Sequence, residues 1–215
     1  EAMISIGNSL GRNTMAMITD MNQPLGNTIG NAIEIREAIE TLKGHGPKDF
    51  TELCMQAAEI MLMQGKVAEN KEEARKMLDE VVASGKAFET FKDMVKDQGG
   101  NVDMIENPEL LPQSKFKTEI KSEESGNVKV LHSERLGVLA MQLGAGRETK
   151  EQDVNHAVGL ELACKRGDKV NKGDTICIVY HDEELKPQWV DELYHAFELT
   201  NEEVAPQPII EKVLS

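Results

Sequence analysis

Paired cysteines are absent from this sequence, and their absence excludes two ways of stabilising a fold. The chain has three cysteines, Cys54, Cys164 and Cys177, and no two of them form a Cys-x-x-Cys pair. An odd number without that spacing fits neither a disulfide framework nor a structural zinc site. We therefore expect reduced thiols in a cytoplasmic protein.

The sequence also lacks an excess of basic residues. It has 24 Lys and Arg against 38 Asp and Glu, which gives a formal net charge of −14. Nucleic-acid binding needs a basic face, so we expect no nucleic-acid partner. No run approaches the roughly 20 apolar residues of a membrane helix, and we expect no membrane partner.

Catalytic motifs are missing as well. The five histidines occur in neither H-x-x-x-H nor H-E-x-x-H spacing, and there is no G-x-S-x-G or Walker loop. The segment "LGAGR", residues 143–147, holds a lone G-x-G, which we interpret as a turn needing positive φ. His181 to Glu184 has metal-like residue types, but an acidic cluster at a helix start explains it equally well. The residues themselves therefore indicate no catalytic group.

The first part of the chain carries helical patterns and one strand. Residues 2–6 resemble the end of a helix without an N-cap, which suggests that the chain begins within a fold. Residues 14–20 are apolar almost throughout and predict a short strand covered on both faces. The loop "MNQPLG" follows, and residues from about 27 to 43 place their apolar side chains on one helical stripe.

Three further helices are predicted before residue 100. The second opens with a capping box formed by Asn70 and Glu73. Each of the three has apolar residues at helical spacing and a glycine near its end. Their ranges are 48–65, 71–84 and 86–97.

The pattern changes after a Pro-containing linker, "NVDMIENPELLPQSK". The segments "FKTEIKS" and "NVKVLHS" alternate as strands do, and residues 157–181 predict two strands flanking a Gly-Asp/Lys-rich connection. A last helix opens at Pro187. We place a domain boundary near residue 112, which divides the chain into 1–112 and a β-rich α+β part, 113–215.

The "MNQPLG" loop is the one candidate site. Pro24 fixes φ and Gly26 permits tight geometry, so carbonyls from Leu25 to Thr28 can turn toward one point. Glu37 lies about two turns along the helix that follows. Carbonyls with one carboxylate are a hard-oxygen set that suits K⁺, Na⁺ or Ca²⁺. The alternative is a tight turn with a solvent-facing glutamate.

At this loop the sequence resembles a known family. "ITDMNQPLGNTIGNAIEIREAIETLKG" resembles a segment of pyrimidine-nucleoside phosphorylases and thymidine phosphorylases. The resemblance continues through "GHGPKDFTELCMQAAEIMLMQGK" and "ASGKAFETFKDMVKDQGGN" to "HSERLGVLAMQLGAGRETKEQDVNHAVGLELACKRGDKVNKGDTICIVY". It covers essentially the whole chain in one collinear order. The family's chains are roughly twice as long, and this sequence resembles their C-terminal half.

The resemblance implies where the catalytic groups lie. The family's phosphate-binding motif, similar to Ser-Gly-Arg-Gly followed by Gly-Gly-Thr, does not occur here, and its pyrimidine-contacting residues also lie upstream. We therefore carry no catalytic or cofactor-binding residue onto this chain. We expect these 215 residues alone to be inactive.

The resemblance does imply an ion site. Bacterial members bind a potassium ion partly upstream and partly in the QPLG segment. The matching positions are Leu25 and Thr28, through main-chain carbonyls, and Glu37, through its carboxylate. Many relatives have Ala where this chain has Thr28, a difference that a backbone ligand tolerates. With two ligands upstream, affinity in this chain should be much reduced.

The implied fold is α/β plus α+β. Residues 1–112 would be the C-terminal portion of the α/β phosphorylase domain. Residues 113–215 would form a hammerhead-like or barrel-sandwich-like α+β domain. Its "RGDKVNKGDTICIV" is similar to hairpins of biotinyl and lipoyl carriers, but it lacks their modified-lysine turn.

The implied activity is phosphorolysis of a pyrimidine nucleoside to the base and a pentose 1-phosphate. Phosphate, nucleoside and a second identical chain are the partners expected of the full-length protein. The alternative is a non-catalytic carrier or scaffold module. A phosphoribosyl transferase is a weaker alternative, because that group lacks a domain like residues 113–215.

Overall fold

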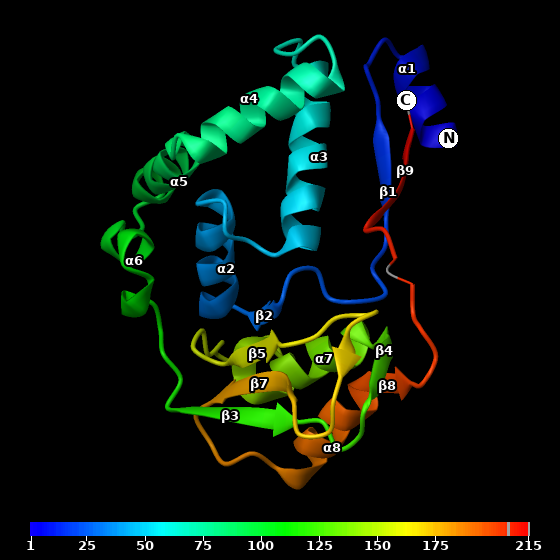
Figure 1. The fold of residues 1–215 in the computed structure, drawn as a ribbon. Helices are drawn as coiled ribbons and strands as arrows, with labels where there is room; N and C mark the ends of the chain where they lie inside the picture. Colours follow the sequence, from blue (N-terminus) through cyan, green and yellow to red (C-terminus); the bar gives the residue numbers. More distant parts are fainter. Residues whose placement is uncertain (206, 215) are drawn as a thin grey trace.

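The computed structural model describes residues 1–205 and 207–214, in which a helical part precedes a β-rich part, as predicted (Figure 1). The helices of the first part are α1 (Ala2–Ser9), α2 (Ala32–Leu42), α3 (Lys48–Gln64), α4 (Lys71–Ala83), α5 (Lys86–Asp97), α6 (Asp103–Glu106) and the 3₁₀ helix η1 (Pro108–Leu110). The later helices are α7 (Ser133–Ala140), the π-helical turn η2 (Met141–Ala145) and α8 (Pro187–Ala196).

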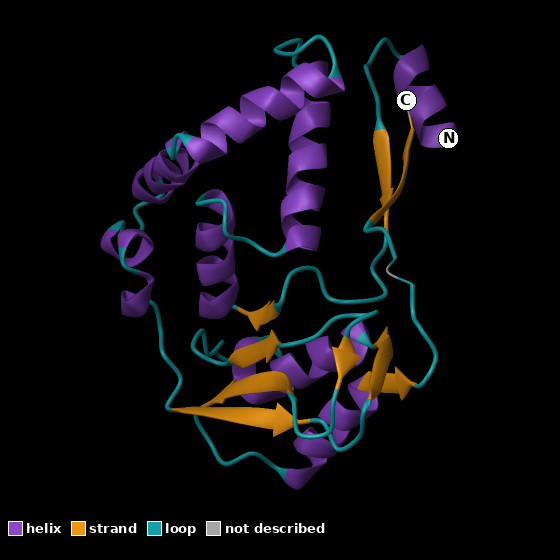
Figure 2. Cartoon of the chain, in the orientation of Figure 1, coloured by secondary structure: helices purple, strands orange, loops and turns teal. Residues whose placement is uncertain are grey.

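The strands form three small antiparallel sheets (Figure 2). The first, β1–β9, joins Ala16–Thr19 to Ile210–Leu214. The second has the order β2–β5–β7–β3, with bounds Thr28–Gly30, Gly159–Leu162, Thr175–His181 and Phe116–Lys121. The third has the order β6–β4–β8, with bounds Lys169–Val170, Gly126–Leu131 and Phe197–Thr200.

The helices α3, α4 and α5 follow the predicted ranges to within a residue or two. The capping box at the start of α4 is confirmed, because the Glu73 N–H donates to Asn70 Oδ1 at 2.9 Å. The Glu73 carboxylate in turn accepts from the Glu69 N–H at 2.8 Å. Local signals determine these helices, so sequence reasoning finds them.

The strand predicted over residues 14–20 exists as β1, but the prediction that both its faces are covered was wrong. Among the described residues β1 pairs with β9 alone, and Ile18 is 44% exposed. The apolar run therefore predicted the strand but not its burial, because β1 lies in a two-stranded sheet.

The helix predicted from about residue 27 begins later. Residues Thr28–Gly30 form β2, and α2 starts at Ala32. The three residues are extended because β2 pairs with β5, about 130 residues further along the chain, and helical periodicity cannot report such a pairing. The predicted linker also contains α6 and η1, and α7 was not predicted.

Two strand pairings cross the boundary predicted near residue 112. The strand β2 adds an edge to the sheet of the later part, and β9 returns to pair with β1 (Figure 1). The first and second parts of the chain are therefore joined by backbone hydrogen bonds. The boundary itself stays a prediction.

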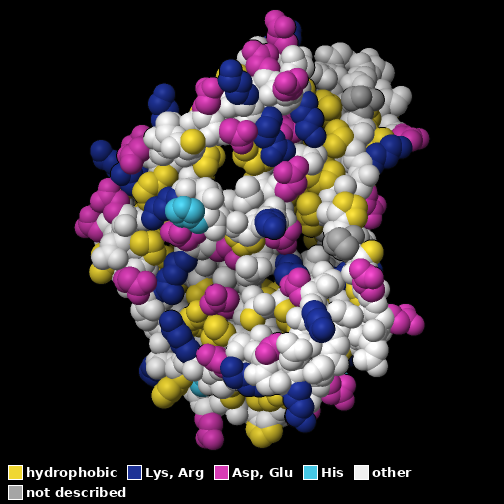
Figure 3. Space-filling model, viewed as in Figure 1, with side chains coloured by type: hydrophobic (Ala, Val, Ile, Leu, Met, Phe, Trp, Pro, Cys, Tyr) yellow, Lys and Arg dark blue, Asp and Glu magenta, His cyan; other side chains and the backbone are white. Residues whose placement is uncertain are grey.

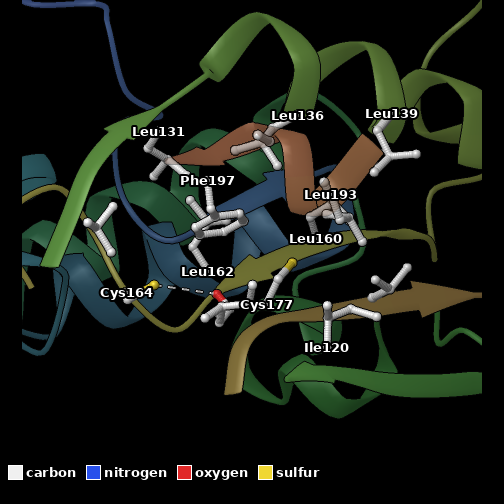
Figure 4. Packing of buried hydrophobic residues seen from close by; sticks show 14 of the residues in the cluster. Ile120, Leu131, Leu136, Leu139, Leu160, Leu162, Cys164, Cys177, Leu193 and Phe197 are labelled. Atoms are coloured by element: carbon white, nitrogen blue, oxygen red, sulfur yellow. Dashed lines mark hydrogen bonds between the residues drawn. The ribbon is translucent and has the colours of Figure 1, made fainter. Parts of the chain in front are cut away.

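The main hydrophobic core lies between the strands of the later part and the helices α7 and α8 (Figure 4). Leu160 of β5 and Leu193 of α8 are almost fully buried in it. Cys164 and Cys177 also lie in this core, and burial raises the pKa of the Cys164 thiol to about 12. All three cysteines are free, as predicted.

No helix in the described part of the chain is both long enough and apolar enough to span a membrane.

Candidate functional site

The loop that precedes β2 is shaped by a glycine that no larger residue could replace without movement. Gly26 is buried and has φ +67°, a left-handed conformation that favours glycine. A Cβ at this position would overlap with the Glu37 carboxylate. Glycine at position 26 therefore allows the Glu37 carboxylate to lie close to the loop.

Glu37 faces the loop rather than bulk solvent, contrary to the alternative of a solvent-facing glutamate. Its Oε1 accepts a hydrogen bond from the Asn27 N–H at 2.8 Å. Burial raises the pKa of the Glu37 carboxyl, while the Asn27 N–H and the nearby polar groups of Thr28 oppose part of that rise. The polar groups around the Glu37 carboxylate thus offset only part of the cost of burying its charge.

The backbone of Thr28 lies on the open edge of the second sheet. The Asn27 carbonyl accepts from the Leu162 N–H at 2.7 Å, and Thr28 is opposite Glu161 in the β2–β5 register. Hydrogen-bonded pairs alternate along an antiparallel ladder, so the Thr28 carbonyl points away from β5. The Thr28 hydroxyl is buried and has no hydrogen-bond partner among the described residues. It nevertheless lies near enough to the Glu37 carboxylate to lower the pKa of Glu37.

Leu25, Thr28 and Glu37 line one hollow of about 410 Å³. The remaining lining is mostly apolar, and Glu34 supplies a second carboxylate at its rim; the other lining residues are Pro24, Ile29, Ile35, Ala38 and Phe50. Residues 1–205 and 207–214 contain no group of three or more His, Cys, Asp or Glu side chains placed to hold a metal ion. An ion in this hollow would therefore depend on backbone oxygens, a donor set that suits a hard monovalent cation.

Sequence reasoning missed two charged residues at this loop. Lys165 Nζ donates to the carbonyls of Pro24 and Gly26, the latter at 2.5 Å, and lies 3.0 Å from Asp49 Oδ2. Asp49 Oδ2 also accepts from the Gly26 N–H at 3.2 Å. Lys165 is about 140 residues from the loop in sequence, so no spacing or periodicity could have indicated it.

The histidines form no second site in the described part of the chain. His181 is buried, with Nε2 2.8 Å from Thr118 Oγ1, Nδ1 2.6 Å from the Glu183 carbonyl and its ring stacked on Phe116. Both ring nitrogens are thus used inside the fold. His45 is in a turn, and its side chain is 73% exposed.

The acidic cluster after His181 does not begin a helix, so that interpretation was wrong. The first turn of α8 contains no acidic residue. Asp182 instead accepts from Asn155 Nδ2 and from the Lys115 N–H, each at 2.7 Å. These hydrogen bonds lower the pKa of the Asp182 carboxyl, and the one from Asn155 has the larger effect. The turn predicted at "LGAGR" is confirmed by Gly144, with φ +108°.

Comparison with known proteins identifies the class of the chain. Residues 127–200 match the family described as "Pyrimidine nucleoside phosphorylase C-terminal domain". That domain places the chain among the nucleoside phosphorylases.

The particular family follows from matches that extend over the whole chain. Pyrimidine-nucleoside phosphorylases of Staphylococcus aureus strains USA300 and NCTC 8325 are each 46% identical over 214 residues, which is 100% of this chain. The protein of strain MSSA476 is 46% identical over 213 residues. The chain belongs to the pyrimidine nucleoside phosphorylase family, as the resemblance predicted. It spans 49% of the length of these relatives.

Proposed function

We propose that this chain is part of an enzyme that cleaves pyrimidine nucleosides with phosphate. The observation that carries the proposal is the 46% identity to pyrimidine-nucleoside phosphorylases over 100% of the chain, including the QPLG loop. The proposed substrates are inorganic phosphate and a pyrimidine nucleoside.

In the proposed reaction a phosphate oxygen forms a bond to C1′ of the pentose, and the bond from C1′ to N1 of the base breaks. The bonding pair stays on N1, which then takes up a proton, and the second product is a pentose 1-phosphate. Such a step needs donors for the phosphate and for the negative charge that develops on the base. We assign none of these donors to the 215 residues, and place them in the half of the relatives' length that this chain does not cover.

The surface of the first part supports packing against further polypeptide. The helix α5 contains Phe88, Phe91 and Val95 on one face, yet none of its residues is buried. Met61 of α3 is 69% exposed. Hydrophobic side chains gather along α3 and β1 (Figure 3). Patches of this kind mark surfaces that another part of a protein covers.

The proposal is tested by reconstitution. The purified chain, the complementary half of the S. aureus relative, and the two together are assayed with uridine or thymidine and phosphate, and release of the base is followed by absorbance. We expect release of the base only from the combined halves, because neither half alone holds a complete site. A mixture without phosphate is the control for hydrolysis.

Two outcomes would contradict this proposal. Phosphorolysis by the chain alone would mean that its catalytic groups lie within these 215 residues. Silence from halves that are folded and shown to associate would favour the non-catalytic carrier or scaffold module. A mass increase on a lysine of the chain purified from its source would support that second function.

We further propose that Leu25 and Thr28, through their carbonyls, and Glu37, through its carboxylate, hold a potassium ion. The three residues line one hollow, and the partly buried Glu37 carboxylate forms no ion pair with another described residue. A bound potassium ion would supply a positive charge inside this hollow, which Lys165 does not line.

Replacing Glu37 with glutamine tests the potassium proposal. KCl should raise the melting temperature of the wild-type chain above that in choline chloride of equal ionic strength. The gain is about 1.4 kcal/mol at ten times the dissociation constant. The Glu37→Gln chain should show no difference between the two salts. Equal responses of the two chains to KCl would contradict the assignment of Glu37.

The same pair of chains has an expected pH dependence. The folded-state pKa of Glu37 is raised, so its neutral form is favoured by folding. The wild-type chain without potassium should therefore be most stable relative to Glu37→Gln at low pH. That advantage is lost as the pH rises from the ordinary pKa of a glutamate through the raised one, and KCl should restore part of it.

We also propose the finer features of the fold and assembly. The second and third sheets with α7 and α8 form the barrel-sandwich-like α+β domain of residues 113–215, and residues 1–112 belong to the α/β domain. The full-length enzyme is a homodimer in the cytoplasm, a reducing location that three free thiols fit.

A further inference from the structure

The ammonium group of Lys165 lies where a small cation would bind. Its three nearest oxygen partners are the Pro24 carbonyl, the Gly26 carbonyl at 2.5 Å and Asp49 Oδ2 at 3.0 Å. An ammonium has three N–H donors, and here it makes two hydrogen bonds to carbonyls and one ion pair with a carboxylate. The side chain is only 18% exposed.

These contacts reach the QPLG loop from the β5–β6 connection. Two more hydrogen bonds reach the loop, from the N–H of Leu162 at the end of β5 to the Asn27 carbonyl at 2.7 Å and from the Arg166 N–H of the connection to Gln23 Oε1 at 3.2 Å. The carbonyls of Pro24, Gly26 and Asn27 are therefore all occupied from this side. In the stretch from Pro24 to Thr28, the carbonyls of Leu25 and Thr28 are the ones proposed above as potassium ligands.

We propose that Lys165 is a positioning residue that acts as a built-in cation for this loop. Its charge gathers the Pro24 and Gly26 carbonyls and the Asp49 carboxylate on one side, and thereby fixes the turn that lines the potassium hollow on the other. Its effect on potassium binding rests on the potassium site proposed above, whereas its role in ordering the loop does not.

The chemistry of the contact favours lysine over other cationic residues. A lysine ammonium is a compact point charge, and it can point three donors at oxygens that lie in different directions. A planar guanidinium is suited instead to the parallel oxygens of one carboxylate. Two carbonyls and one carboxylate oxygen around a single nitrogen match the first geometry.

The first experiment is chemical rescue of the Lys165→Ala chain. This substitution removes the atoms of a propylammonium ion beyond Cβ. We expect its melting temperature to fall by at least about 4 °C, since charge-assisted hydrogen bonds are lost. Propylammonium chloride should recover at least half of that loss in a saturable way. Tetramethylammonium, which has no N–H donor, should recover none.

The matched control is Lys172→Ala, in the turn between β6 and β7, where the lysine is exposed. Neither its melting temperature nor that of the wild-type chain should respond to propylammonium more than to tetramethylammonium. Equal recovery of Lys165→Ala by the two ammonium ions, or no recovery by either, would overturn the proposal.

The second experiment measures potassium binding in the Lys165→Met chain, which keeps an apolar stem of similar length. We expect the KCl concentration that gives half-maximal stabilisation to rise at least tenfold over the wild-type value. Lys165→Arg should lie closer to Lys165→Met than to the wild type. A purely structural role would lower the melting temperature in both salts and leave the KCl midpoint unchanged.

The two proposals fail in different ways. If the wild-type chain shows no specific response to KCl, the potassium proposal fails, and the propylammonium rescue still decides the role of Lys165. If the wild type responds to KCl and the Lys165→Met chain binds potassium at least as tightly as the wild type, the positioning role is overturned and the potassium site stands.

Discussion

Replacing Arg75 with methionine is expected to lower the free energy of unfolding by about 3–5 kcal/mol. The guanidinium lies between α3 and α4 and contacts Glu59, whose side chain is 1% exposed. It also donates to both carboxylate oxygens of Glu52, at 3.1 and 3.2 Å. Without Arg75 the Glu59 carboxylate stays buried, and Lys71 Nζ, at 3.5 Å, is then its one cationic partner among the described residues. Urea titration at neutral pH would measure the loss.

Two further variants separate burial of an unpaired charge from loss of packing. Glu59→Met combined with Arg75→Met removes both charges and should recover most of the stability, because replacing a buried ion pair by apolar residues is often neutral. Lys71→Met removes a largely exposed partner and should cost less than about 1 kcal/mol. A double variant as unstable as Arg75→Met alone would contradict this explanation.

Replacing Gly159 with alanine is expected to cost about 1–3 kcal/mol and to weaken the β2–β5 pairing selectively. A Cβ at this position would overlap with the Ile29 carbonyl and lie 2.7 Å from Ile33 Cδ1. The opposing atom belongs to backbone, so it cannot rotate away. Gly159 is opposite Gly30 in the register, and the two glycines allow this close approach of the strands.

Hydrogen exchange would identify where the Gly159→Ala chain opens. The Leu162 N–H, which donates to the Asn27 carbonyl, should exchange faster than in the wild type. The amides of the β3–β7 pair should keep their wild-type protection relative to one another. Gly137→Ala in α7 is the matched control, because an added Cβ there would meet no described atom within 4 Å outside the adjoining backbone of its own helix. It should be neutral or stabilising by up to about 1 kcal/mol. Equal deprotection of both strand pairs would contradict a local effect.

Much of the helical part of the fold was predictable. The helices α3, α4 and α5 each have apolar residues at helical spacing and a glycine near the end, and the capping box of Asn70 and Glu73 at the start of α4 forms as expected. The strand β2 was not predictable, because three residues have no periodicity of their own and become extended by pairing with β5. The helix α7 was missed between strand-like segments.

The candidate site shows the same division. Pro24, Gly26 and Glu37 lie within 14 positions of one another, so the sequence alone indicated that carbonyls and a carboxylate could converge. In the fold Gly26 lies beside the Glu37 carboxylate, and binding of an ion there stays a prediction. Asp49 and Lys165 could not be found in this way, because their contacts depend on where distant elements pack.

The sequence by itself determined the family of this protein and the location of α3, α4 and α5, since residue identity and local hydrogen bonding are written in short stretches of chain. Tertiary structure alone decided that β2 joins the later sheet and that Lys165 supplies its charge to the QPLG loop. Both depend on groups some 130 to 140 residues apart in the sequence. Chain folding brings such groups together for reasons of packing and hydrogen bonding that no local pattern records.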